Sequence, residues 1–295
     1  MKNQVSIILV SYNTRELTKN CLKSIYEQTK GVDFDIFIVD NNSEDGSQQM
    51  IKEEFPQVTL IESNENLGFG RANNVAIKQS NAKYVFLLNT DTILLNNSVK
   101  ILYDFMEKEE NKNIAACGGN LFDENKNHTF SHGVFLSPWS KFLKTFGLKY
   151  LDKKTLSKLK ADYTNKNSEL KEVEFICGAD LMMRKSILDK IGLFDEKFFL
   201  YYEETELQHR MKEKGYKIFI VPEAEIMHLE SASSKNLVYK KQLFLQSEYY
   251  YLTCCFAKNI FEKFLIKMIY LTSLFIKLLQ YPKMTFKTYW YIIKN

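Results

Sequence analysis

The sequence predicts an α/β protein in which helices flank a mainly parallel central sheet, followed by a C-terminal amphipathic helical extension. Strand-like and helix-like stretches alternate through residues 5–88, and this alternation is typical of parallel strands joined by right-handed crossovers. The strand-like stretches are nearly continuous apolar runs, as expected where helices cover both faces of a sheet. With 295 residues, the chain can form one large domain with an extension or two small domains.

The first predicted elements are a strand at residues 5–10 and a helix after it. The run VSIILV is too short for the core of a signal peptide and is followed at once by the polar letters SYNTRE, so we interpret it as a buried strand. Asn13 and Glu16 have the spacing of a capping box, and Cys21 and Ile25 continue at helical spacing. A helix is therefore expected to begin close to Asn13.

The same alternation repeats along the first half and returns in the second. Residues 120–172 are instead rich in Lys and Asn, and residues 141–160 have only weak helical spacing. We interpret this region as an insertion or lid over an acceptor, or as a plain surface excursion. The periodicity predicts strands at residues 34–39, 58–62, 84–88, 173–176 and 216–221, and helices at residues 47–55, 70–80 and about 181–191.

Four polar clusters follow predicted strands of the first half, each at the carboxyl end of its strand. Open α/β sheets bind ligands along that edge. We therefore expect a ligand site where these loops converge. The clusters are Ser11-Tyr12-Asn13, Asp40-Asn41-Asn42-Ser43, Asn64-Glu65-Asn66 and Asn89-Thr90-Asp91.

Two common phosphate-binding patterns are missing from the sequence. The loop SYNTRE contains no glycine that would let a pyrophosphate approach the backbone, and the chain has no GxxxxGK[ST] motif. These absences argue against a nicotinamide dehydrogenase and against a P-loop enzyme. Any phosphate charge must therefore be met by a metal ion or by side chains.

Two segments of the first half are candidates for ligand binding, and each has a structural alternative. The carboxylate of Asp40 could accept hydrogen bonds from a base or ribose, but DNNSEDG is also composed of favoured turn residues. Gly68 and Gly70 permit close backbone approach at a helix start, which is a natural anion site. Arg71 and Asn74 would add donors there, although a helix start alone explains the glycines almost as well.

Three glutamates lie close together in FDEKFFLYYEETELQHR. On a helix, Glu203 and Glu206 would share one face and Glu204 would diverge, so at least one can point into a cleft beside the preceding tyrosines. Crowding against aromatic rings raises a carboxyl pKa, which suits a general base, whereas acidic residues are also favoured at any helix start. His228 follows a strand-like stretch and is either a metal ligand or a structural histidine.

The C-terminal region differs from the body in charge. Residues 236–295 contain nine lysines and two glutamates, a net charge of +7, which leaves −3 for residues 1–235 because the whole chain carries +4. Its longest charge-free run, residues 268–276, is far shorter than the roughly 20 residues that span a bilayer. We expect a basic amphipathic helix whose apolar stripe is Phe256, Ile260, Phe264, Met268, Leu271 and Phe275.

This C-terminal region has several candidate partners. A membrane interface is the leading one, with Trp290 as a belt residue. The alternative is a helical hairpin that packs on the body or on a second subunit in a homodimer. Nucleic acid is disfavoured as a partner because the region contains no Arg.

The cysteines indicate a reducing compartment. The chain has five, an odd number, with irregular spacing and no CxxC pair. This argues for reduced thiols in the cytosol and against a disulfide or zinc framework.

Seven motifs occur in an order that resembles the inverting glycosyltransferases of family 2, in particular the rhamnosyltransferase-like branch of bacterial surface-polysaccharide assembly. The resemblance covers about residues 4–235, and it lies in the order of motifs that are individually weak. It implies the GT-A fold, with a nucleotide-sugar-binding half at residues 1–118, an acceptor-binding half at residues 119–235 and a tail at residues 236–295. The motifs are SYN (11–13), VDNNSEDG (39–46), NENLGFGRANN (64–74), LLNTDT (87–92), GADLMMRK (178–185), FDEKFFLYYEETELQHR (194–210) and EIMHLESASSK (225–235).

The resemblance also implies a role for each matching residue. Glu204 would be the catalytic base that deprotonates an acceptor hydroxyl. Asp91 and His228 would hold a divalent cation, Mn²⁺ or Mg²⁺, that bridges the phosphates of the donor. Asp40 would contact the nucleobase. Further nucleotide-sugar contacts would come from Ser11, Tyr12, Asn13, Asn42, Asn66, Gly68, Arg71, Asn74, Asn89 and Thr90, and the donor sugar and acceptor would meet Gly178, Ala179, Asp180 and Glu203.

The chain departs from the family pattern at two places. Asn89 stands where the D-x-D motif has its first acid, which removes one negative charge from the metal site. Glu203 and Glu204 stand where the family has a Glu-Asp pair, and Glu206 replaces the usual Asp two positions on. A base with one extra methylene reaches further, which matters where the geometry of attack is tight.

Together these observations predict a metal-dependent inverting glycosyltransferase that acts in surface polysaccharide (O-antigen, capsule or cell wall) biosynthesis. It would move a sugar from a nucleotide-diphosphate sugar to a hydroxyl of a glycan or lipid-linked glycan, in the cytoplasm at the inner face of the cell membrane. One rival is a degenerate module that binds nucleotide-sugar or glycan without turnover. A sugar-nucleotide pyrophosphorylase is a weaker rival, because SYNTRE lacks the expected GxGxR loop.

Overall fold

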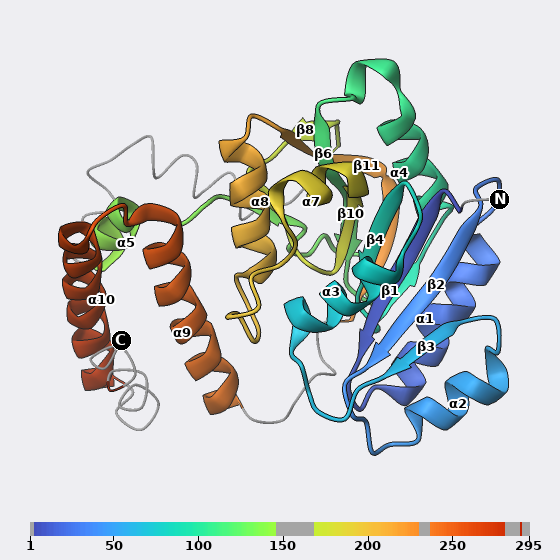
Figure 1. Ribbon diagram of the computed structural model, residues 1–295, viewed down its shortest axis with the longest axis horizontal. Helices are drawn as coiled ribbons and strands as arrows, with labels where there is room; N and C mark the ends of the chain where they lie inside the picture. Colours follow the sequence, from blue (N-terminus) through green and yellow to red (C-terminus); the bar gives the residue numbers. More distant parts are fainter. Residues whose placement is uncertain (1–2, 146–167, 230–236, 281–289, 291–295) are drawn as a thin grey trace.

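The structure is a computed structural model that describes residues 3–145, 168–229, 237–280 and 290. Figure 1 shows a central sheet with helices on both faces and two long helices set to one side. The strands are β1 (Val5–Ser11), β2 (Phe34–Asp40), β3 (Thr59–Glu62), β4 (Tyr84–Leu88), β5 (Thr92–Leu94), β6 (Ile114–Phe122), β7 (His132–Gly133), β8 (Lys171–Glu172), β9 (Phe175–Ile176), β10 (Asp180–Arg184) and β11 (Lys217–His228). The helices are α1 (Arg15–Gln28), α2 (Ser47–Glu54), α3 (Phe69–Gln79), α4 (Ser98–Glu107), the 3₁₀ turn Glu109–Asn111, α5 (Pro138–Thr145), α7 (Lys185–Ile191), α8 (Glu203–Glu213), α9 (Leu237–Phe256) and α10 (Ile260–Gln280).

The sheet is mainly parallel. Its order is β3-β2-β1-β4-β10-β6-β11-β5, with β8 paired to β11 outside this path. Strands β1 to β4 run in one direction, β10 is antiparallel to both of its neighbours, and β6 and β11 are parallel to each other. Because β1, β2, β3 and β4 end at the same edge, the loops that follow them meet there. The predicted fold class is confirmed.

The sheet is covered on both faces, which explains its continuous apolar strands. In β1, Val5, Ile7 and Leu9 pack into the cluster under α1, α2 and α4, whereas Ile8 packs into the cluster under α3, α7 and α8. All four side chains are at most 1% exposed. These two apolar layers fix the strands, and the strand ends in turn position the polar loops.

Most predicted elements of the first half are confirmed to within one residue at each end, but the predicted capping box is wrong. Helix α1 begins at Arg15, and Thr14 before it makes no side-chain capping bond. Asn13 instead adopts a left-handed φ of +54°, and its Oδ1 accepts a hydrogen bond from the backbone N–H of Glu44 at 2.8 Å. Asn13 therefore connects the loop after β1 to the loop after β2.

Two predictions in the second half also need correction. The helix expected at about residues 181–191 begins only at Lys185, because Asp180–Arg184 forms the strand β10. Its apolar residues Leu181, Met182 and Met183 are fully buried between β4 and β6, and a short apolar run of this kind cannot be told from a helix segment by periodicity. The strand expected at residues 216–221 continues as β11 to His228.

The two C-terminal helices form a hairpin that packs on the rest of the chain. Figure 1 shows α9 beside α8, and α10 beside α5. An aromatic-rich cluster that includes Phe198, Tyr249 and Tyr270 fills the interface. Asn259 lies in the short connection between α9 and α10. Its Oδ1 accepts the backbone N–H of Glu262 at 2.9 Å and so caps the start of α10.

A buried ion pair links the hairpin to α5. Lys141 Nζ lies 2.7 Å from Glu248 Oε2, and both side chains are nearly inaccessible, at 6% and 9% exposed. The Tyr270 hydroxyl donates to the same carboxylate oxygen at 2.6 Å, and the Lys141 ammonium lies 4.5 Å from the centre of the Tyr270 ring. One residue from each of α5, α9 and α10 thus meets in a low-dielectric interior. The region predicted as a lid contributes α5 to this contact, and residues 146–167 of it lie outside the described residues.

The apolar stripe predicted for the C-terminal region is divided between the two helices. Phe256 is the last residue of α9, while Ile260, Phe264, Met268 and Phe275 lie on the exposed side of α10. The buried side of α10 is formed by Ile266, Tyr270 and Leu274, and Leu271 of the predicted stripe packs against the same cluster. Among the described helices, none combines the length and the apolar character needed to cross a membrane.

Candidate active site

Two adjoining cavities open along the carboxyl edge of the sheet. We call them the asparagine cavity, about 400 Å³, and the carboxylate cavity, about 360 Å³. The asparagine cavity is lined by Val10, Tyr12, Asn13, Thr14, Asn41, Asn66, Gly68, Thr90, Phe199, Tyr239 and Leu243. The carboxylate cavity is lined by Phe130, Cys177, Gly178, Ala179, Tyr201, Glu203, Glu204 and His228. Both linings also include Phe69, Asn89, Asp91, Leu200 and Lys240, which we call the junction.

Asp91 and His228 lie side by side at the boundary of the cavities. The pairing of β5 with β11 sets His228 opposite Thr92, and the backbone N–H of Leu229 donates to the Asp91 carbonyl at 3.0 Å. Nε2 of His228 is 3.3 Å from Oδ1 of Asp91. The other ring nitrogen, Nδ1, is buried and has no hydrogen-bond partner among the residues that the structure describes. A carboxylate and an imidazole are thus held within reach of one ligand.

This pair has the chemistry of a partial metal site. No group of three or more His, Cys, Asp or Glu side chains is close enough to hold a metal ion within the described part of the chain. Mg²⁺ and similar cations commonly take only one or two protein ligands and complete their shell with phosphate oxygens and water. The residues present therefore fit a divalent cation that is bound together with a phosphate-bearing ligand, and they fit an all-protein metal site poorly.

Hydrogen bonds hold the rest of the LLNTDT loop in place. The backbone N–H of Asn89 donates to the Ala179 carbonyl at 3.0 Å, and the Thr92 hydroxyl donates to the Asn89 carbonyl at 2.7 Å. The Thr90 hydroxyl lies 3.1 Å from that of Thr14. These contacts join the end of β4 to β10 and to α1, so that Asp91 faces the junction.

Glu203 and Glu204 begin α8 and line the carboxylate cavity. Burial raises the pKa of Glu204 to about 7. Burial, and next the neighbouring charge of Glu204, raise the pKa of Glu203 well above its ordinary range. Its Oε2 is buried, and no described residue is a hydrogen-bond partner for it. A helix N-terminus ordinarily favours the ionised carboxylate, so desolvation outweighs the helix dipole here. Near neutral pH the pair therefore contains a carboxyl group that can donate and a carboxylate that can accept a proton.

The backbone before these acids is in an uncommon conformation. Tyr201 and Tyr202 have φ values of +71° and +68°, which costs on the order of 1–3 kcal/mol for each such residue. Both rings pack on Phe244 of α9, with centroids 5.6 and 5.3 Å away, and Tyr202 also packs on Tyr251 at 5.1 Å. The hairpin therefore holds the turn that directs Glu203 and Glu204 into the cavity.

Gly68 joins the loops that precede α3 and α8. Its φ is +78°, and a Cβ atom there would lie 2.1 Å from the Phe199 carbonyl oxygen. That oxygen accepts the backbone N–H of Phe69 at 3.0 Å, while Asn41 Nδ2 donates to the Gly68 carbonyl at 3.0 Å. Only glycine fits this contact, which brings the walls of the two cavities together.

Several predicted site residues line the cavities directly. Tyr12 is 49% exposed in the asparagine cavity, and Asn66 Oδ1 accepts the backbone N–H of Gly68 at 2.9 Å. Gly178 and Ala179 line the carboxylate cavity, and a Cβ atom at Gly178 would lie 3.7 Å from Cγ of Glu204. The predicted residues that the structure brings together around the cavities are Tyr12, Asn13, Asn66, Gly68, Asn89, Thr90, Asp91, Gly178, Ala179, Glu203, Glu204 and His228.

Other predicted site residues lie outside both linings. Asp40 is fully buried, and its Oδ1 accepts bonds from Ser43 N–H and Gln48 Nε2, as in a structural turn. The Asn74 amide donates to and accepts from the backbone of Phe194. Of the remaining four, Arg71 lies 3.4 Å from Glu65, Asp180 accepts the Gly119 N–H at 2.6 Å, and Ser11 is buried beside Thr14. Asn42 is exposed and has a φ of +64°.

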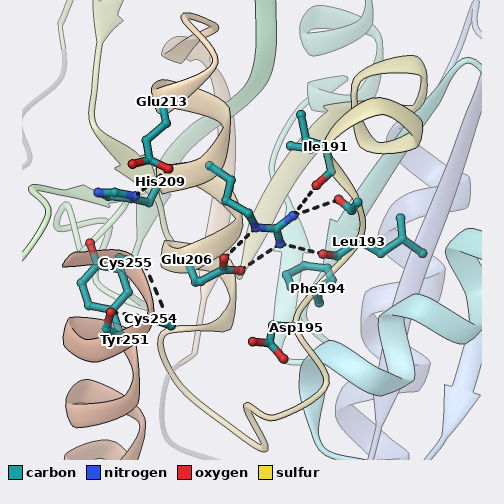
Figure 2. A network of polar contacts seen from close by, with 12 residues as sticks. Ile191, Leu193, Phe194, Asp195, Glu206, His209, Glu213, Tyr251, Cys254 and Cys255 are labelled. Carbon is teal, nitrogen blue, oxygen red and sulfur yellow. Dashed lines mark hydrogen bonds and ion pairs between the residues drawn. The ribbon is translucent and has the colours of Figure 1, made fainter. Parts of the chain in front are cut away.

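Glu206 has a structural environment. Its carboxylate accepts hydrogen bonds from the Arg210 guanidinium, at 2.6 Å from Nε and 2.9 Å from one terminal nitrogen. Figure 2 shows Glu206 with these contacts as dashed lines. The same guanidinium donates to the carbonyls of Ile191 and Leu193 at 2.7 and 2.6 Å. Glu206 therefore orients an arginine that holds the loop after α7, and it does not line either cavity.

Sequence reasoning missed the part of the site that comes from α9. Tyr239, Lys240 and Leu243 lie on one side of its first two turns and line the asparagine cavity. No motif or local period marks them, because their position depends on how the hairpin packs. The aromatic residues Phe69 and Phe130 also line the carboxylate cavity and were not predicted.

The sequence is similar to those of known glycosyltransferases. Residues 6–192 match the sequence model of the family described as glycosyl transferase family 2. The low-salt glycan biosynthesis hexosyltransferase Agl10 of Haloferax volcanii is 24% identical over 280 residues, which cover 92% of this chain and 81% of that protein. The N-acetylglucosaminyl-diphospho-decaprenol L-rhamnosyltransferase of Mycobacterium tuberculosis is 23% identical over 260 residues, which cover 79% of this chain and 78% of that protein.

Two solved structures share the fold. The mannosyltransferase PcManGT of Pyrobaculum calidifontis, in complex with GDP-Man and Mn²⁺, superposes with a TM-score of 0.58 at 14% identity over 92% of this chain and 73% of that chain. GalNAc-T7 with UDP, GalNAc and Mn²⁺ superposes with a TM-score of 0.59 at 14% identity, over 85% of this chain and 48% of that one. At this identity the likeness shows the fold alone, which is the GT-A fold.

Proposed function

Because this chain belongs to glycosyl transferase family 2 and is a glycosyltransferase, we propose that it is an inverting enzyme that uses a nucleotide-diphosphate sugar and a divalent cation. The acceptor is a hydroxyl of a glycan or lipid-linked glycan in surface polysaccharide biosynthesis. One observation carries the proposal: Asp91 and His228 lie where two cavities meet, and Glu203 and Glu204 line the second cavity. The names of the hexosyltransferase and rhamnosyltransferase relatives support this acceptor class.

The donor would extend across both cavities. The nucleoside would lie in the asparagine cavity, the sugar in the carboxylate cavity and the diphosphate at the junction. Asp91 and His228 would hold Mn²⁺ or Mg²⁺, which when bound supplies positive charge to the phosphates of the leaving group. The Mn²⁺ and nucleotide in the two superposed structures support this arrangement.

Glu204 would act as the general base. A pKa of about 7 leaves much of it ionised near neutral pH while keeping it basic enough to accept a proton. It would take the proton of the acceptor hydroxyl as that oxygen attacks the anomeric carbon, and the bond from this carbon to the diphosphate oxygen would break with its electron pair leaving on the diphosphate. One displacement inverts the anomeric configuration. Glu203, held protonated by its surroundings, would donate a hydrogen bond to a sugar hydroxyl.

The exposed side of α10 supports a membrane partner. Phe261 and Phe264 are 66% and 56% exposed, and Lys263 lies exposed between them. An apolar surface with flanking lysines suits anionic lipid, so we propose that the enzyme works at the inner face of the cell membrane, where a lipid-linked acceptor would be found.

A screen of nucleotide-diphosphate sugars tests the proposal. Thermal unfolding is followed with UDP-, GDP- and dTDP-sugars in the presence and absence of Mn²⁺, and product formation is followed with the sugar that stabilises most. We expect one nucleotide class to raise the unfolding temperature, and to do so more strongly with Mn²⁺. If no nucleotide sugar stabilises the protein with either Mn²⁺ or Mg²⁺, the proposed function is wrong.

A further inference from the structure

Lys240 is a cationic residue at the junction to which the proposed function assigns no role. It lies in the first turn of α9 and lines both cavities. Among the described residues of the two linings it is the sole lysine or arginine. Its side chain is half-buried, so its charge is screened less than that of a surface lysine.

The covalent structure of the donor explains why the junction needs positive charge. A diphosphate links the nucleoside to the sugar, so a donor that occupies both cavities must pass its diphosphate through the junction. Besides Lys240, the junction contains the apolar Phe69 and Leu200, the neutral Asn89 and the anionic Asp91. Among these residues Lys240 alone brings a positive charge to balance the anionic ligand.

We propose that Lys240 binds the diphosphate of the donor and stabilises it as it leaves, an inference that rests on the proposed function. When the bond from the anomeric carbon to the diphosphate oxygen breaks, its electron pair adds negative charge to the diphosphate. The ammonium of Lys240 donates hydrogen bonds to the phosphate oxygens, so its interaction strengthens in the transition state. The N-terminus of α9, where Lys240 lies, adds a smaller favourable field for an anion.

This role makes the C-terminal hairpin part of donor binding. The turn of α9 that carries Lys240 is continuous with the segment whose Phe244 packs on Tyr201 and Tyr202 before the proposed base. One helix therefore contacts the leaving group on one side and supports the acidic pair on the other. The polar loops of the sheet alone do not form the complete site.

Calorimetry with a matched pair of variants tests the role of Lys240. Binding of UDP, GDP and dTDP is compared with binding of uridine, guanosine and thymidine, in Mn²⁺, for the wild type, Lys240→Met, Lys240→Arg and Lys241→Met. Lys241 is the control, because it is exposed in the same helix, lies 5.4 Å from the Phe244 ring centre and lines neither cavity. Lys240→Met should weaken binding of the preferred nucleoside diphosphate by roughly tenfold or more.

The other binding measurements distinguish the loss of a positive charge at Lys240 from a general disturbance of the structure. Binding of the matching nucleoside should not change in Lys240→Met, Lys240→Arg should recover most of the diphosphate affinity, and Lys241→Met should behave as the wild type. The inference is overturned if Lys240→Met binds the diphosphate as tightly as the wild type, or if it loses nucleoside affinity equally. A wild type that binds none of the three diphosphates would overturn the proposed function, and this inference with it.

Discussion

The central sheet and the C-terminal hairpin are held in place by different kinds of contact. Apolar clusters on both faces hold the sheet between its helices. The hairpin packs through tyrosines around the buried pair of Lys141 and Glu248. A buried charge that loses its partner is far more costly than a lost surface contact. We therefore expect that removing a polar side chain from the sheet loops impairs catalysis, whereas removing one from the hairpin interior lowers the free energy of unfolding.

The largest expected effect is on catalysis, from Asp91→Ala in the loop after β4. Removing the carboxylate should abolish the gain in nucleoside diphosphate affinity that Mn²⁺ provides and lower the transfer rate by about a hundredfold or more. The unfolding temperature should stay close to that of the wild type. Calorimetry with and without Mn²⁺ measures the first effect, and an unchanged metal dependence would show that the cation is held elsewhere.

The corresponding substitution in the hairpin is Glu248→Ala. It leaves the Lys141 ammonium and the Tyr270 hydroxyl without their shared carboxylate, and we expect the free energy of unfolding to fall by about 3–5 kcal/mol. Denaturant unfolding measures the loss. Glu53→Ala is the control, because this carboxylate is exposed and accepts a bond from Gln49, and its effect should stay within about 0.5 kcal/mol. Equal effects of the two substitutions would contradict the distinction between the regions.

The sequence predicts those parts of the fold and of the site that depend on local patterns, and it does not predict those that depend on contacts between distant segments. Strand and helix positions in the first half depend on local periodicity, and the polar loops follow from the strand ends, so Asn89 to Asp91 could be located in advance. Asn74 and Asp180 lie in two other motifs, NENLGFGRANN and GADLMMRK, but their hydrogen bonds to Phe194 and Gly119 depend on distant segments. Lys240 lines the junction because of how α9 packs, and no local pattern carries that information.

The pH dependence of transfer rate and of stability tests the raised pKa of Glu204. With its pKa raised to about 7, Glu204 must lose its proton to act as a base, so the transfer rate should increase about tenfold per pH unit below 7 and level off above it. Stability should change in the opposite direction. The folded state binds a proton at Glu204 more tightly than the unfolded state, whose ordinary glutamate pKa is near 4.5, so the free energy of unfolding should fall as pH rises from about 4.5 to about 7.

Rate and unfolding profiles measured over this pH range check both signs. Glu204→Gln should flatten the decline in stability that Glu204 contributes. A transfer rate that does not change between pH 5 and pH 8 would exclude a base with this raised pKa.

The smallest effect on stability is expected from the double substitution Phe261→Ser and Phe264→Ser. Both rings are largely exposed, so the free energy of unfolding should change by no more than about 0.5 kcal/mol, whereas sedimentation with anionic vesicles should weaken. Leu170→Ser, at another residue that is about half exposed, is the control and should keep vesicle binding. Wild-type vesicle binding by the double variant would contradict the membrane role, and a change from dimer to monomer would assign the surface to a second copy of the chain.

The central claim is that Glu204 is the base and Glu203 its neutral neighbour. Single-turnover transfer by Glu204→Gln and Glu203→Gln, with the preferred donor and a glycan acceptor, tests it most directly. Both variants should bind donor with nearly wild-type affinity, since the nucleoside lies in the other cavity and a glutamine at position 203 can still donate a hydrogen bond to a sugar hydroxyl. Glu204→Gln should lose about a hundredfold to ten-thousandfold in transfer rate, while Glu203→Gln, which mimics a protonated carboxyl group, should lose much less. Near-native transfer by Glu204→Gln, or a larger loss in Glu203→Gln, would contradict the account.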